Sequence, residues 1–130
     1  MTSLNITGFY AGLLALLLIV LAVNIIRLRY QFKVGIGDGG QTPLAKAIRI
    51  HGNFIEYIPL ALVLLACYEV SGANVMFLHA LGSILFIGRV LHAIGLTKST
   101  GVSKQRQIGM TSTFIVIIIL SIENIRLFVF

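Results

Sequence analysis

Apolar residues fill four long stretches of the chain, and short polar segments separate them. The stretches cover residues 4–29, 43–69, 75–96 and 103–129. A helix of about 20 apolar residues is long enough to cross the hydrocarbon core of a bilayer. The pattern therefore predicts an all-α, polytopic membrane protein. We expect a single domain over residues 1–130, folded as an antiparallel bundle of four transmembrane helices.

Composition supports the same fold class. The chain is 58% hydrophobic and only 11% charged, and its mean hydropathy is +1.00. A soluble core of 130 residues cannot hide that much apolar surface. The first stretch is too long for a signal-peptide core and has no basic segment before it, so we interpret it as a retained helix. Cys67 is the single cysteine, which excludes an intramolecular disulfide and a cysteine metal cluster.

Charge predicts the orientation of the helices. The net charge of the chain is +6, and the basic residues lie mostly at the ends of the apolar stretches rather than in a basic run. This distribution argues against nucleic acid as a partner. Arg27, Arg29 and Lys33 precede the glycine-rich segment 35–40, and Lys98 and Lys104 flank the last connection. Because basic residues concentrate on the cytoplasmic side, both termini are expected to be non-cytoplasmic.

The second stretch carries a ladder of polar side chains. Arg49, Asn53 and Glu56 follow the spacing i, i+4, i+7, which places them on one stripe of a helix, and Tyr57 borders this stripe. Ten Ile, Leu, Val or Phe residues between positions 48 and 65 contribute roughly −3 to −6 kcal/mol to membrane insertion. One Arg or Glu near mid-membrane costs about +2.5 to +3.5 kcal/mol. The ladder must therefore face protein or a wet cavity.

Two interpretations of the ladder remain. It could join helices through an ion pair between Glu56 and Arg49 or Arg89. Alternatively it forms a binding site, because one cation, one amide and one carboxylate can bind a carboxylate, a peptide group and an ammonium. The third stretch adds Arg89 and His92 at i, i+3, and the fourth begins near Arg106. With the predicted orientation these groups lie at similar depths, which favours an arginine-rich cavity open to the cytoplasm.

Smaller features give local predictions. Thr42 is expected to be an N-cap residue before Pro43. Gly82 and Gly88 are expected to permit close contact between helices. Glu123 and Arg126 are expected to form a local ion pair. The three histidines do not share metal-ligand spacing on one helix face, so no metal site is expected.

The polar motifs together resemble the MAPEG family, the membrane-associated proteins in eicosanoid and glutathione metabolism. The resemblance rests on Arg49-x-x-x-Asn53-x-x-Glu56-Tyr57-x-Pro59 in the second helix and Gly88-Arg89-Val90-Leu91-His92 in the third. It covers nearly the whole chain, and the combination of the two motifs is specific.

The resemblance implies a homotrimer of four-helix subunits that holds glutathione, as co-substrate, between neighbouring subunits. It implies glutathione contacts at these positions: Arg27, Arg49, Asn53, Glu56, Tyr57, Arg89 and His92. Arg106 matches the catalytic arginine that stabilises the glutathione thiolate, although Lys104 competes with it for this role. The chain has Leu96 where several members of the family have a tyrosine.

The expected function is that of a bacterial-type member similar to microsomal glutathione transferases. Such a protein lies in the inner membrane and acts as a glutathione transferase or glutathione-dependent peroxidase on lipophilic electrophiles taken from the bilayer. The alternatives are a small non-catalytic membrane transporter, a structural oligomer with an internal polar ladder, or an enzyme of this fold that uses another thiol.

Overall fold

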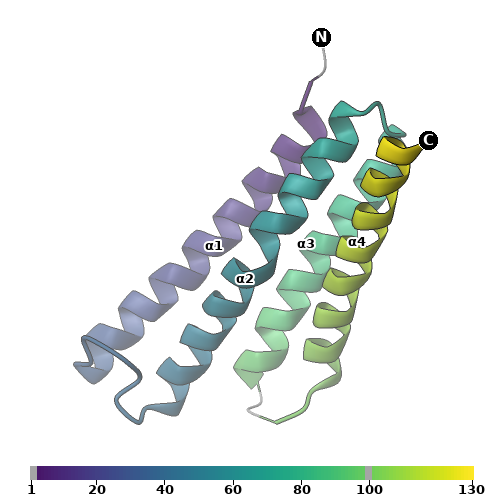
Figure 1. Ribbon diagram of the computed structural model, residues 1–130. Coiled ribbons are helices and arrows are strands. Elements are labelled where there is room, and N and C mark those ends of the chain that lie inside the picture. The colour runs from purple at the N-terminus through teal and green to yellow at the C-terminus, as the bar shows by residue number, and fades with distance from the viewer. Residues whose placement is uncertain (1–2, 99–100) are drawn as a thin grey trace.

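The computed structural model describes residues 3–98 and 101–130 and places them in four helices. They are α1 (Asn5–Phe32), α2 (Thr42–Val70), α3 (Val75–Lys98) and α4 (Lys104–Val129). Successive helices run in opposite directions, so that the start of α1, the α2–α3 turn and the end of α4 lie at one end of the bundle (Figure 1). All four are long and apolar enough to cross a membrane. The all-α, four-helix membrane fold is thus confirmed. The largest difference in bounds is at the end of α1, which reaches Phe32 rather than Arg29.

Helices α2 and α3 form the centre of the bundle. Each of them packs against both α1 and α4, whereas α1 and α4 do not contact each other in the described parts of the chain. The main core contains apolar side chains from all four helices, namely Leu14, Phe54, Ile58, Ala61, Leu65, Tyr68, Leu78, Leu81, Leu85, Val116 and Leu120. Only 11% of the apolar span of α1 and 17% of that of α4 is buried in one chain. The two outer helices therefore leave large apolar faces for lipid or for other subunits.

Glycines allow the closest approach between helices. A Cβ atom at Gly82 would clash with the ring of Tyr10 on α1, and one at Gly88 would clash with Ser112 on α4. Both predicted close contacts are thus confirmed. Gly109 extends the α3–α4 contact, because its Cβ would overlap the Gly88 carbonyl oxygen and approach the backbone nitrogen of His92 to 2.8 Å.

The helix ends follow known capping rules, with one correction. The hydroxyl of Ser103 accepts a hydrogen bond from the backbone N–H of Arg106 (3.2 Å) and caps α4. Gly72 takes a positive φ of 83° and lets the chain turn after α2. The N-cap of α2 is Gln41, not Thr42, and it makes no side-chain capping bond. Thr42 is already helical, so that Pro43 stands at the second helical position, where its missing N–H still costs nothing.

Polar contacts fasten α1 to the other helices near the termini. The Glu69 carboxylate, at the end of α2, accepts hydrogen bonds from the backbone N–H groups of Ile6 (2.9 Å) and Thr7 (2.7 Å). The Tyr10 hydroxyl lies 3.0 Å from Nδ1 of His79 and 2.9 Å from Oγ of Ser83, both on α3. These contacts set the position of α1 against α2 and α3.

Candidate functional site

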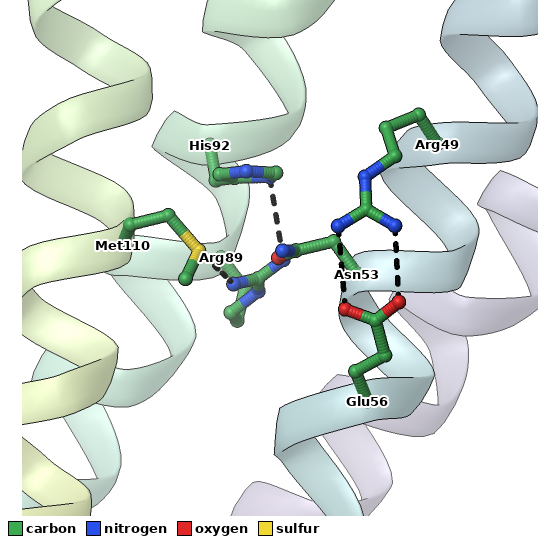
Figure 2. Close-up of polar contacts among 6 residues, drawn as sticks. All are labelled: Arg49, Asn53, Glu56, Arg89, His92 and Met110. Atoms are coloured by element: carbon green, nitrogen blue, oxygen red, sulfur yellow. Dashed lines mark hydrogen bonds and ion pairs between the residues drawn. The ribbon is translucent and has the colours of Figure 1, made fainter.

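The polar ladder of α2 presents a charged pair on the outside of the chain. The Arg49 guanidinium donates two hydrogen bonds to the Glu56 carboxylate, with N–O distances of 3.0 and 3.3 Å. The two side chains remain 60% and 46% exposed. Both residues belong to α2, so this ion pair cannot join two helices. Their contact therefore leaves a zwitterionic surface on a membrane-spanning helix (Figure 2).

A second polar layer lies inside the bundle behind that pair. Arg89 is only 2% exposed, although its side chain is a cation. Its Nη2 donates to Oδ1 of Asn53 at 2.5 Å and lies 3.3 Å from Nδ1 of His92, and its Nη1 lies 3.6 Å from Sδ of Met110. Figure 2 shows Asn53 reaching from α2 toward Arg89 on α3, with Met110 approaching from α4. Three helices thus meet at one guanidinium.

The partners of Arg89 are neutral. An amide oxygen, an imidazole nitrogen and a thioether sulfur hold its terminal nitrogens, and its Nε is buried without a hydrogen-bond partner among the described residues. Burying a cation without a paired anion is costly because the solvation of the charge is lost. Such a group keeps its positive potential and attracts an anion to the neighbouring surface.

Tyr57 and Arg106 lie around these two layers. The Tyr57 ring packs edge-on against Phe114 of α4, with ring centroids 5.3 Å apart. The Arg106 guanidinium donates to the carbonyl oxygen of Gly101 at 3.3 Å. The backbone nitrogen of Arg106 lies 2.7 Å from the position that a Cβ atom on Gly95 would take, about one turn of α3 beyond His92. Residues predicted from three helices thus gather at one level.

Arg27 lies away from this group in the single chain. Its guanidinium donates to Oδ1 of Asn24 at 2.9 Å, and it lines a cavity of about 250 Å³ together with Lys46 and the start of α2. Within the described parts of the chain, no hydrogen bond or ion pair joins Arg27 to the other predicted site residues.

Some contacts of the site were not predicted from the sequence. Met110 touches Arg89 through sulfur, and Gly109 lets His92 approach α4. Neither residue type signals a site, and nothing in the spacing pointed to them.

The predicted ion pair of Glu123 and Arg126 is confirmed at 2.7 Å, and Glu123 also accepts a hydrogen bond from the Tyr68 hydroxyl at 3.3 Å.

Comparison with known proteins identifies the family of the chain. The MAPEG family profile matches residues 7–126. Two relatives are each described as "Inner membrane protein YecN", one from Escherichia coli strain K12 and one from Escherichia coli O6:H1 strain CFT073. Each is 38% identical over 120 residues, which cover 92% of this chain and 90% of the relative. The chain, with its four membrane-spanning helices, therefore belongs to the MAPEG family.

Proposed function

We propose that this protein binds glutathione at the outer face of α2 and transfers it to lipophilic electrophiles, or uses it to reduce lipid hydroperoxides. The observation that carries the proposal is the exposed Arg49–Glu56 pair. Glu56 lies halfway along a helix of 29 residues, at the depth where a charge facing lipid is most costly. The pair therefore needs a polar neighbour, which residues 3–98 and 101–130 of the single chain do not supply.

Glutathione matches the charges of this face. Its ammonium group would bind Glu56, and a carboxylate would bind Arg49, so that the ligand replaces the internal pair with two new ones. Tyr57 borders the same face and supplies a phenol for the peptide groups. Asn53 turns its amide oxygen inward to Arg89 and supports this face from behind. Arg89, held behind the face by Asn53 and His92, adds positive potential that favours the second carboxylate.

Arg106 is the proposed catalytic residue. A free thiol has a pKa of about 8.5. An adjacent guanidinium lowers this pKa and so raises the fraction of reactive thiolate. The thiol proton leaves to solvent, the thiolate sulfur forms a bond to the electrophilic carbon, and the leaving group departs with its electron pair. With a hydroperoxide, the sulfur takes the terminal oxygen, an alcohol is released, and a second glutathione converts the sulfenic acid to a disulfide and water.

A homotrimer fits this arrangement. A neighbouring subunit would cover the Arg49–Glu56 face and bring its own Arg27 to the ligand, and the groove between subunits would admit the lipophilic substrate from the bilayer. The names of the two relatives and the basic loops favour the inner membrane of a bacterium, with both termini non-cytoplasmic.

Glutathione titration of the purified protein by calorimetry tests the proposal. Arg49→Ala and Glu56→Gln should each weaken binding at least tenfold, because each removes one partner of a charge-assisted pair, worth about 1.5–3 kcal/mol. Arg126→Ala and Glu123→Gln are matched controls, because they make the same changes in the ion pair near the end of α4. They should leave the glutathione affinity unchanged. Unchanged affinity in both α2 variants would remove the site assignment.

One observation favours a second candidate, a structural oligomer or small transporter. The bond between Arg89 and Asn53 joins α3 to α2 in a buried place, as an internal polar link would. In a structural oligomer a second subunit would contact the Arg49–Glu56 face, so Glu56→Gln would lower the thermal stability without any thiol ligand present. A transporter would carry solutes across liposome membranes. Glutathione binding that depends on Arg49 and Glu56 separates the two functions.

A further inference from the structure

Two neighbouring cavities, together called the groove, lie between α1 and the helices beside it. The first, of about 270 Å³, lies between α1 and α3 and is lined by Leu17, Val20, Leu21, Val90, Ala93, Ile94, Thr97 and Lys98. The second, of about 250 Å³, lies at the loop end and is lined by Asn24, Arg27, Leu28, Pro43, Lys46, Ala47, Ile50 and Thr97. Thr97 belongs to both linings, which places the cavities end to end.

The α1 wall of the groove is a single stripe. Its lining residues from Leu17 to Leu28 follow the spacing i, i+3, i+4, i+7, i+10, i+11, which is one face of an α-helix. At about 1.5 Å per residue this stripe is about 16 Å long. One leaflet accounts for half of a hydrocarbon core about 30 Å thick. The groove therefore has the length of one leaflet.

The chemistry of the groove changes along its length. The part between α1 and α3 is lined almost entirely by aliphatic side chains. The loop end carries Arg27 and Lys46, and Lys98 stands at the junction. Within the described residues, the lining of both cavities includes no carboxylate. The groove is thus apolar toward the membrane centre and cationic at the interface.

We propose that this groove binds one anionic phospholipid. The phosphate lies between Arg27 and Lys46 at the loop end, and one acyl chain follows the α1–α3 part of the groove. Basic pockets between transmembrane helices bind anionic headgroups through charge. A zwitterionic headgroup has no net charge and is therefore bound less strongly. The site lies apart from the Arg49–Glu56 face of α2 and shares only Arg27 with the proposed glutathione site. A bound lipid would fix α1 against α3.

Lys46 carries the test, because the proposed glutathione site also uses Arg27. The native protein, released from detergent, is titrated with phosphatidylglycerol and with phosphatidylcholine of the same acyl chains, and bound lipids are counted by native mass spectrometry. We expect one phosphatidylglycerol per chain with a clear preference over phosphatidylcholine. Lys46→Gln should weaken phosphatidylglycerol binding about fivefold, as expected for one lysine near the headgroup. Lys33→Gln removes an exposed charge from the same end of α1 and should leave phosphatidylglycerol binding unchanged.

A second pair of variants tests the acyl-chain part. Ala93→Phe fills the α3 wall of the groove and should abolish the preferred lipid, whereas Ala80→Phe, at an exposed position of the same helix, should not. The glutathione affinity of Lys46→Gln should equal that of the native protein. Failure of the lipid proposal can therefore be distinguished from failure of the proposed glutathione function.

Several outcomes would overturn the proposal. One is that Lys46→Gln and Ala93→Phe bind phosphatidylglycerol as the native protein does, and another is that phosphatidylcholine binds equally well. A third is that millimolar inorganic phosphate alone displaces the lipid, which would show a site for a soluble anion. The last is that Ala93→Phe lowers the number of chains per assembly without changing lipid binding, which would show that a second copy covers the groove.

Discussion

Arg89 is the residue that most constrains the site. It is almost completely buried, and neutral groups from three helices hold its terminal nitrogens. An adjacent carboxylate would have neutralised it, whereas an amide oxygen satisfies its hydrogen bonds and leaves its charge in place. Asn53 is therefore the link between the buried cation and the exposed pair on α2.

Removing the amide of Asn53 should destabilise the protein. Asn53→Leu keeps the size of the side chain but leaves buried donors of Arg89 without an acceptor, at a cost of about 1–3 kcal/mol. Thermal unfolding in detergent should show a lower Tm for this variant. Asn24→Leu is the matched control, because Asn24 accepts from the exposed Arg27 and such contacts contribute little. Equal Tm values for the two variants would show that Arg89 does not depend on Asn53.

The residue that activates the thiol can be identified separately. Arg106→Gln should raise the pKa of bound glutathione toward its value in water, because the guanidinium that favours the thiolate is lost. Lys104→Gln removes the same charge two residues earlier and should change this pKa less. Ultraviolet absorbance of the thiolate during a pH titration of the complex measures both. A larger shift in the lysine variant would transfer the catalytic role to Lys104.

At the scale of elements, α3 and α4 depend on their glycine contact. Gly109→Leu would place a side chain against the Gly88 carbonyl and the backbone of His92, which forces the two helices apart. We expect a loss of about 1–3 kcal/mol or more, together with weaker glutathione binding because His92 moves. The measurements are thermal unfolding and calorimetry. Gly12→Leu on α1 is the control, since a Cβ there meets nothing within 4 Å, and a similar loss in this variant would contradict the explanation.

The helices could be predicted from sequence because each is a long apolar run, and the membrane leaves few other structures open to such a run. The ladder could be predicted as one stripe, but not the separation within it. Asn53 and Glu56 differ by about 60° on the helix, and this suffices to turn the amide inward and the carboxylate outward. Contacts such as that of Met110 with Arg89 depend on how α4 packs, which single-sequence periodicity does not describe.

At the scale of the whole molecule, the two long connections are predicted to be cytoplasmic. In a Cys67→Ser background, Gln41→Cys reports on the α1–α2 connection and Asn74→Cys on the α2–α3 turn. A membrane-impermeant thiol reagent added to intact spheroplasts should label Asn74→Cys and spare Gln41→Cys, because basic residues concentrate on the cytoplasmic side. The reverse labelling pattern would invert the topology and place the Arg27 end of the bundle outside.

The contact of Glu69 with the start of α1 also sets an order of events during synthesis. The first helix can enter the bilayer by itself, as its hydropathy is the highest of the four. Its leading amides, at Ile6 and Thr7, find their acceptor only 63 and 62 residues later in the chain. Until α2 has been synthesised, these amides can bond only to water at the membrane surface, so the contact that fixes the start of α1 cannot form before Glu69 has left the ribosome.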